Sequence, residues 1–175
     1  MKTIHTRNRV ASFVIAILLL LPISPALAGG AHKHHGGGGD VFVTFTKWGS
    51  GANPSDSTLG FFAGIVGGDV TGTFVGEVLI KKVSANPLLT NGMVHLEAIY
   101  EVQAGTHQGN HSFTALIQGG QNLVTGAAVL DGAILAGWRL GAPVHVHYQK
   151  ISSCAGNQAG PCFQGTIEIE RDSED

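Results

Sequence analysis

From Asp40 onward, apolar and polar residues alternate in short segments, and this alternation restricts the possible folds more than any other feature of the chain. The segments are bounded by Gly, Asn, Asp and Pro. Successive side chains of a β-strand point to opposite faces, whereas an amphipathic helix repeats about every 3.6 residues. Because helical periodicity is absent almost throughout, the sequence predicts an all-β domain.

The clearest expected strand covers residues 93–103, with one apolar face made by Val94, Leu96, Ala98, Tyr100 and Val102. The other expected strands cover residues 41–46, 59–66, 70–82, 113–117, 123–129, 133–138, 144–149 and 163–170. Glycine-rich and polar segments predict a loop at 49–58 and turns at 67–69, 85–92, 119–122 and 131–132.

About eight strands with short connections are expected to pair antiparallel with their sequence neighbours. Such a sheet either closes on itself or splits into a sandwich, and closure removes the exposed edges. We therefore favour a single closed antiparallel β-barrel with meander topology. An outer-membrane barrel would place the apolar faces outside, but an aromatic content of 7% is too low for two interfacial girdles and the chain ends in acidic residues.

The first 28 residues have the pattern of a secretory signal peptide. Lys2, Arg7 and Arg9 precede an unbroken apolar run of 11 residues, and small residues occupy positions 26 and 28. That run is too short to span about 30 Å of hydrocarbon as a helix. We expect Sec-type export to the periplasm or the extracellular space, with residues 1–28 as signal, 29–39 as a His- and Gly-rich tether, 40–170 as the barrel and 171–175 as an acidic tail.

Export changes the charge of the domain, because the three basic residues of the signal leave seven Lys and Arg against 12 Asp and Glu, a formal charge of −5. This balance disfavours nucleic acid as a partner. No later stretch is long and apolar enough for a membrane span. We expect an apolar small molecule as the partner and no cofactor, while the oligomeric state stays open.

Cys154 and Cys162 flank a short loop rich in Gly, Asn and Pro. In an oxidising compartment this pair is expected to form a disulfide. Closing so short a loop contributes about 2 to 3 kcal/mol in the chain-entropy model. A catalytic thiol or a metal pair is the alternative, but no neighbouring cation in the sequence would lower a thiol pKa.

Histidines occur in two places where they are candidates for binding a metal ion. His32, His34 and His35 in the tether are either a weak Cu, Ni or Zn site or a solvated linker. His145 and His147 are two apart on an expected strand, so both imidazoles point the same way. They form a candidate metal site with His95, Glu97 or Glu101 alongside, or they are exposed and unligated because Val144, Val146 and Tyr148 occupy the inner face.

Two segments resemble the allene oxide cyclase-like barrel family and its dirigent relatives, which are small calycin-type barrels. Residues 113–129 (FTALIQGGQNLVTGAAV) look like that family's strand, double-glycine turn and small-residue strand, and residues 130–141 (LDGAILAGWRLG) follow. The glycine-rich stretch 60–78 is similar to its opening hairpin. The resemblance covers roughly residues 40–170 and implies a barrel with an apolar interior. In the plant cyclases a carboxylate on the first strand steers ring closure, whereas residues 41–48 here contain no Asp or Glu.

Five aromatic residues are candidates for a ligand-binding interior, each as either packed core or pocket wall: Phe74, Tyr100, Phe113, Trp138 and Tyr148. Two functions follow. The barrel is an isomerase or cyclase that templates an apolar substrate, which requires a polar group inside an open cavity. Alternatively, it is a carrier of a small molecule or a metal, or a structural barrel. No catalytic residue can be assigned from the sequence.

Overall fold

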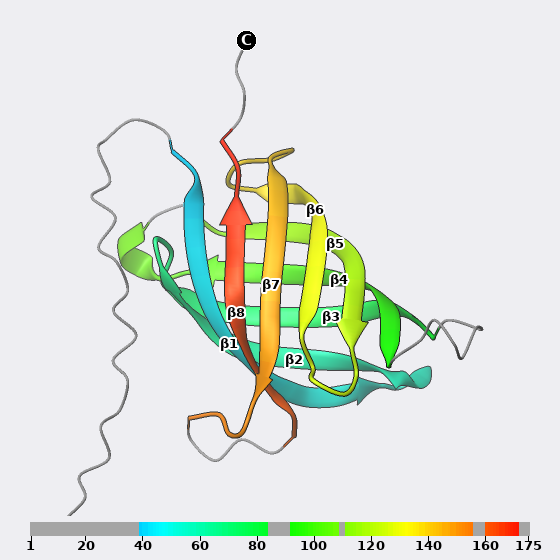
Figure 1. Ribbon diagram of the computed structural model, residues 1–175. Coiled ribbons are helices and arrows are strands. Elements are labelled where there is room, and N and C mark those ends of the chain that lie inside the picture. The colour runs from blue at the N-terminus through cyan, green and yellow to red at the C-terminus, as the bar shows by residue number, and fades with distance from the viewer. Residues whose placement is uncertain (1–38, 84–91, 109–110, 156–159, 172–175) are drawn as a thin grey trace, which may run out of the picture. The chain divides into compact units, whose positions relative to one another are not determined.

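A computed structural model describes residues 39–83, 92–108, 111–155 and 160–171. Eight antiparallel strands form one closed barrel in which each strand pairs with its sequence neighbours and the last pairs with the first (Figure 1). The strands are β1 (Val41–Asn53), β2 (Asp56–Gly68), β3 (Gly72–Val83), β4 (Met93–Ala104), β5 (Phe113–Asn122), β6 (Ala128–Gly137), β7 (Pro143–Ile151) and β8 (Cys162–Ile169). The expected fold class is confirmed.

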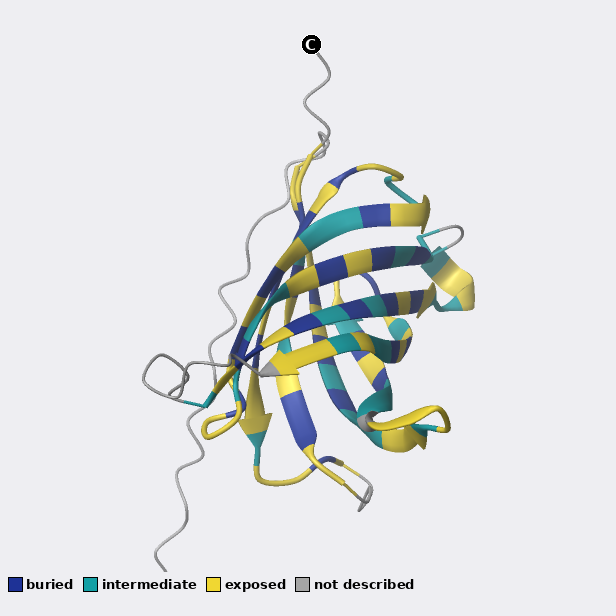
Figure 2. Cartoon of the chain, turned by 90° about the vertical axis from the view of Figure 1, so that its right-hand side faces the viewer, coloured by how far each residue is buried: buried dark blue, intermediate teal, exposed yellow. Residues whose placement is uncertain are grey.

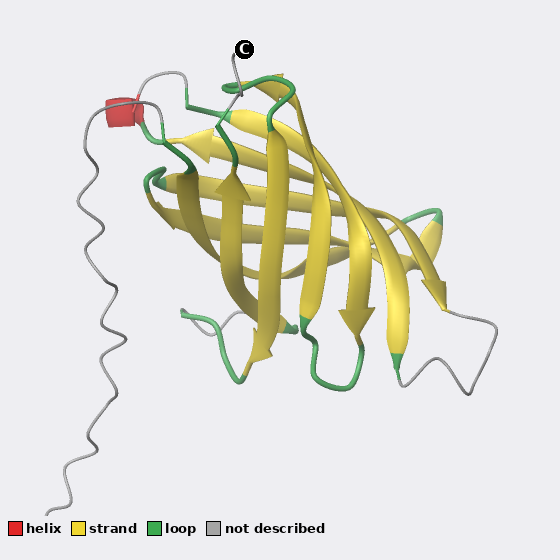
Figure 3. Ribbon diagram, turned by 45° about the horizontal axis from the view of Figure 1, so that its top comes forward, coloured by secondary structure: helices red, strands yellow, loops and turns green. Residues whose placement is uncertain are grey.

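The strands bury one face and expose the other, as the alternating bands of Figure 2 show. In β4, the inward set runs from Val94 through Tyr100 to Val102, and the residues between them are exposed or half-buried. A short 3-10 helix, η1 (Thr106–Gln108), lies between β4 and β5 and is the coiled element in Figure 3. No helix in the described part of the chain is long and apolar enough to cross a membrane.

Three expected breaks are wholly or mostly strand in the structure. The expected loop at 49–58 shortens to a turn at residues 54 and 55, and the rest of it continues β1 and β2 into a long hairpin with two bulges. The double glycine within 119–122 lies inside β5, and Asp131 and Gly132 lie inside β6. The reason is the close approach of neighbouring strands: a Cβ at Gly119 would overlap the carbonyl oxygen of Val129, and one at Gly132 would overlap that of Leu116. These glycines serve packing between strands and not turns.

The two ends of the barrel differ. At the end where β1 begins and β8 finishes, Val41 pairs with Ile169, and fully buried side chains fill the interior. Outside this end the Arg139 guanidinium donates hydrogen bonds to the carbonyl oxygens of Gly39, Ile169 and Glu170, at 2.8, 3.4 and 3.2 Å. The core at this end consists mainly of Val43, Phe45, Val70, Phe74, Val102, Phe113, Ile134, Val144 and Ile169. We call it the filled end.

At the opposite end lie the β1–β2 hairpin, the β5–β6 turn and the disulfide-bonded connection between β7 and β8. The expected turn at 85–92 lies outside the described residues except for Gly92. The proposed signal peptide, residues 29–38 of the tether with His32, His34 and His35, and the four last residues of the acidic tail also lie outside them. We call this the open end.

Candidate functional site

A cavity of about 440 Å³ occupies the open end of the barrel. Its walls come from the late part of β1, β3 and β7 and the early part of β2, β4, β6 and β8, together with the end of β5. The inner wall is mostly apolar and aromatic, and it includes Phe62, Leu96, Ala98, Tyr100, Leu130, Tyr148 and Phe163. Small-molecule sites in proteins are typically concave and lined by apolar and aromatic side chains in this way.

One amine projects into this apolar environment. On β1 the inward positions are Val41, Val43 and Phe45, and the next is Lys47, which is only 3% exposed. Lys47 pairs across the strands with Gly64 of β2 and Phe163 of β8, so its backbone is held in the sheet on both sides. The strand therefore delivers an ammonium or amine group to the inner wall of the cavity, where it contributes to the lining.

Aromatic rings surround the Lys47 Nζ atom. The ring centroids of Tyr148 and Tyr100 lie 3.9 and 4.6 Å from it. Four phenylalanine rings lie 5.1 to 5.9 Å away, those of Phe45, Phe62, Phe74 and Phe163. Distances below about 6 Å allow a cation–π attraction whenever the amine is protonated.

The same amine donates a hydrogen bond to the hydroxyl of Tyr100. Among the described residues the buried polar side chains are Lys47 and Gln121, so no described carboxylate is buried beside the amine. An unpaired buried charge is costly, and the amine escapes this cost by losing its proton. Burial accordingly lowers the pKa of Lys47 well below its usual value.

The two tyrosines that face Lys47 resist ionisation. Burial raises the pKa of Tyr100, and the nearby Tyr148 adds to this shift. Burial alone raises the pKa of Tyr148. Both phenols therefore stay protonated at neutral pH and can act as hydrogen-bond donors inside the cavity. Neutral amine and neutral phenol are the states that an apolar, buried environment favours.

The cavity mouth is more polar than its interior. Gln121 is buried at the wall, while the exposed Lys81 and Lys150 and the half-buried Glu77 lie further out. Pro161 borders the mouth, and its carbonyl oxygen accepts a hydrogen bond of 3.2 Å from the backbone of Gly49. Polar groups thus meet water at the entrance, and apolar rings line the interior.

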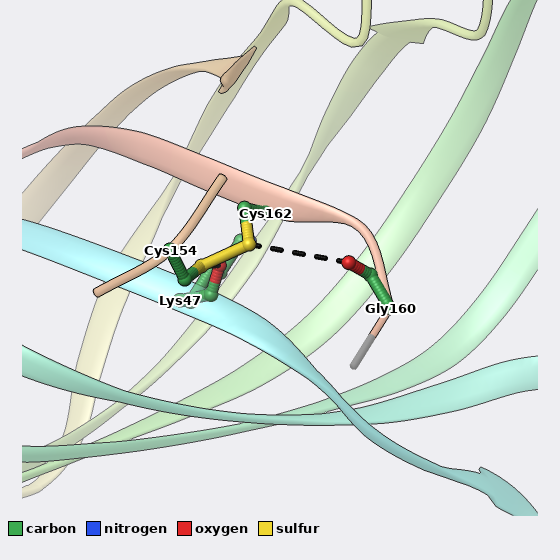
Figure 4. The surroundings of a disulfide bond; sticks show 4 residues. All are labelled: Lys47, Cys154, Gly160 and Cys162. Carbon is green, nitrogen blue, oxygen red and sulfur yellow. Dashed lines mark hydrogen bonds between the residues drawn. A yellow bond between two sulfur atoms is a disulfide. The ribbon is translucent and has the colours of Figure 1, made fainter. Parts of the chain in front are cut away.

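Cys154 and Cys162 form a disulfide with their Cα atoms 5.6 Å apart. The Cys154 sulfur lies 3.7 Å from the backbone carbonyl oxygen of Lys47, and the Cys162 sulfur lies 3.9 Å from that of Gly160 (Figure 4). Cys162 also pairs with Trp48 in the β1–β8 ladder. The disulfide therefore fixes the β7–β8 connection against the part of β1 that carries the amine.

The five aromatic candidates from the sequence occupy four environments. Tyr100 and Tyr148 line the cavity, and both are buried. Phe74 lies below the cavity, stacked on Phe45 at 5.5 Å and edge-on to Tyr100 at 4.7 Å. Phe113 is packed in the core of the filled end.

Trp138 lies just beyond β6, half-buried against the core. Its ring is 4.2 Å from that of His111, and the Arg139 guanidinium lies 5.2 Å from its centroid. Trp138 is not part of the cavity wall.

The strand histidines lie on the outer surface. His147 is exposed, and His145 makes contacts of 2.7 Å with Asp131 and 2.9 Å with Glu170. These two carboxylates raise the pKa of His145, mainly through the hydrogen bond with Asp131. His95 contacts Glu97 at 3.4 Å instead of joining the other histidines. Within the described residues no group of three His, Cys, Asp or Glu side chains is arranged to hold a metal.

Lys47 is the site residue that the sequence analysis missed. The signal was present, because the alternation of Val41, Val43 and Phe45 places the next inward side chain at position 47. Lysine is almost never fully buried, so its residue type predicts an exposed side chain at that position. Position in the strand, and not residue type, identifies it.

The arrangement combines three chemical properties: an apolar volume, an amine free of a described buried counter-ion, and a phenol hydrogen-bonded to that amine. It can enclose a largely apolar molecule and contact one polar atom of it. A neutral amine can also act as a base or a nucleophile. No protein-family model, no curated protein and no solved structure matches this chain.

Proposed function

We propose that this chain is an exported barrel that binds an apolar small molecule, with the body of the ligand among the aromatic rings and one polar atom at Lys47 and Tyr100. The single observation that carries the proposal is the cavity of about 440 Å³ with an amine in its inner wall. That volume lies within the range of about 300 to 1,000 Å³ typical of ligand sites. A buried lysine without a described buried carboxylate has little structural benefit, which favours a role in ligand contact.

The proposal also includes the export of this protein and its membership in the barrel family that its sequence resembles. A disulfide is typical of proteins that mature in an oxidising compartment, and the first 28 residues have the pattern of a signal peptide. The closed eight-stranded antiparallel barrel has the architecture that the resemblance to allene oxide cyclase-like and dirigent-like proteins implies. The ligand, by this proposal, is met outside the cytoplasm.

A second function, a cyclase or isomerase, is favoured by the Lys47–Tyr100 pair. An enzyme of this kind needs a polar group inside an open cavity, and Lys47 and Tyr100 both line the cavity. The amine in its neutral form accepts a proton and the phenol donates one, so the pair supplies a base and an acid at adjacent positions. Confinement of a flexible apolar substrate would lower the barrier further.

Filling the cavity tests the binding function. Ala98→Phe places a ring at the cavity wall, and we expect it to abolish the fluorescence increase that the mature protein produces with the apolar dye N-phenyl-1-naphthylamine. Ile65→Phe, an outward position on β2 that is 53% exposed, is the matched control and should leave dye binding unchanged. Circular dichroism melts establish that both variants fold. Equal dye binding by wild type and Ala98→Phe would contradict the proposal.

A further inference from the structure

We propose that Lys47 forms a reversible covalent imine with an aldehyde or ketone carried by an apolar ligand. This inference rests on the proposed binding function and names the class of ligand. The geometry that supports it is the position of the Nζ atom: it lies in the cavity wall, on a strand held between β2 and β8, and it is hydrogen-bonded to the phenol of Tyr100. A carbonyl group at the leading end of an apolar ligand would meet this amine directly.

The electrostatic environment favours the nucleophilic form of the amine. Six aromatic rings lie within 5.9 Å of Nζ, and the described buried residues include no carboxylate. The pKa of Lys47 is lowered by burial, so its lone pair is available at a pH where exposed lysines are protonated. The groups that face it are Tyr100 from β4, Tyr148 from β7 and the phenylalanines of β1, β2, β3 and β8.

The reaction balances without an external oxidant or reductant. The Nζ lone pair forms a bond to the carbonyl carbon, the carbonyl π electrons move to oxygen, and one N–H proton is transferred to that oxygen. The carbon–oxygen bond then breaks as the oxygen takes a second proton, water leaves, and nitrogen forms the C=N bond and loses its remaining N–H proton.

Tyr100 is placed to relay these protons, because its hydroxyl is hydrogen-bonded to Nζ. It donates a proton to the departing oxygen and regains one from nitrogen, so it ends unchanged. The product is a neutral imine, and a neutral product suits a cavity without a described buried counter-ion.

A carboxylate ligand is the competing chemistry at the same amine. It would require the ammonium form of Lys47 and would bury an ion pair, whose desolvation offsets much of the Coulomb attraction. A carbonyl ligand needs no buried charge. The observations therefore favour the carbonyl, and the comparison of the two ligands is part of the test.

The experiment treats the mature, disulfide-bonded protein with 2-naphthaldehyde at pH 7 in the presence of sodium cyanoborohydride, which reduces an imine to a stable amine. Intact mass spectrometry and peptide mapping then locate the adduct. We expect one naphthylmethyl group per chain, at Lys47, in at least about tenfold excess over any other lysine, because exposed lysines are almost fully protonated at this pH. Lys82→Met, which removes an exposed amine outside the cavity lining, should label normally.

Lys47→Met and Lys47→Arg should both lose the adduct, and the arginine variant retains a cation while lacking the amine. N-phenyl-1-naphthylamine binding reports on the cavity in every variant. A wild-type protein that binds the dye but shows no adduct, or shows adducts spread over several lysines, overturns the inference and leaves the binding function standing. Tighter binding of 2-naphthoic acid than of 2-naphthaldehyde, with no adduct, also overturns it. Failure to bind the dye or any of the naphthyl probes overturns both proposals.

Discussion

The two halves of the barrel interior share the same alternation of inward and outward side chains, but one half is packed and the other contains a cavity. The filled end is closed by side chains such as Val43, Val70 and Ile169, which are fully buried. At the open end the strands continue past Lys47 and Leu96, but the side chains leave a cavity of about 440 Å³. Inward orientation therefore does not by itself make a core. The register shifts of β1 and β3 lie at the open end, where a bulge bends the strand.

The largest expected difference between the halves is the cost of losing a phenylalanine. Phe74, 1% exposed, stacks on Phe45 and contacts Tyr100, whereas Phe163, 7% exposed, borders the cavity. We expect Phe74→Ala to lower the free energy of unfolding by about 3 to 5 kcal/mol. Phe163→Ala should cost less, because one side of its ring already lacks packing partners. Urea denaturation of both variants measures the difference. Equal costs would show that the cavity is packed in solution.

An intermediate effect is expected at the Lys47–Tyr100 hydrogen bond. Tyr100→Phe leaves the buried amine without its partner, which should reduce the free energy of unfolding by about 1 to 3 kcal/mol. Adding Lys47→Met removes the unpaired group, so the double variant should be at least as stable as wild type. Urea denaturation of wild type, the two single variants and the double variant completes a double-mutant cycle. If the double variant were less stable than Tyr100→Phe alone, the amine would be stabilising the barrel by some other contact.

A smaller effect is the pH dependence of stability, which should differ between a residue inside the barrel and a residue on its outer surface. The pKa of Lys47 is lowered in the folded chain, so between that pKa and about 10.4 the unfolded chain binds a proton that the folded chain does not. Stability should therefore rise with pH in this window, and Lys47→Met should remove the rise. Tyr100 and Tyr148 act in the opposite direction only above about pH 10. In thermal melts between pH 6 and pH 9 the tyrosines therefore contribute nothing, and the difference between wild type and Lys47→Met gives the contribution of the lysine.

His145, on the outer surface, should change the stability with pH in the direction opposite to Lys47. Its pKa is raised by Asp131 and Glu170, so its contribution is present below about pH 6.5 and is lost as pH rises through the folded pKa. Its side chain is 37% exposed, and screening should limit the effect of His145→Gln to less than about 1 kcal/mol. The same melts measure it. The stability difference between wild type and variant should change with pH in opposite directions for Lys47→Met and His145→Gln. A change in the same direction for both would refute this assignment.

The sequence predicted the closed barrel because alternation is a local property, visible within each segment. It did not predict which glycines turn the chain: Gly119 and Gly132 lie inside strands, where a neighbouring backbone leaves no room for a Cβ. That requirement arises only after strands from distant parts of the sequence have paired. Tyr100 was recognised as inward by its alternation, whereas Lys47, equally inward, was missed because its residue type suggested exposure.

The hydrogen bonds from Arg139 to Gly39, Ile169 and Glu170 have a practical consequence for handling this protein. The first strand begins and the last strand finishes at the filled end, as Figure 1 shows for β1 and β8. An affinity handle or a fluorophore attached near Arg171 is therefore anchored at the end of the barrel away from the cavity. Immobilising the protein through that position would leave the cavity end facing the solution, which suits biosensor measurements of the proposed small-molecule binding.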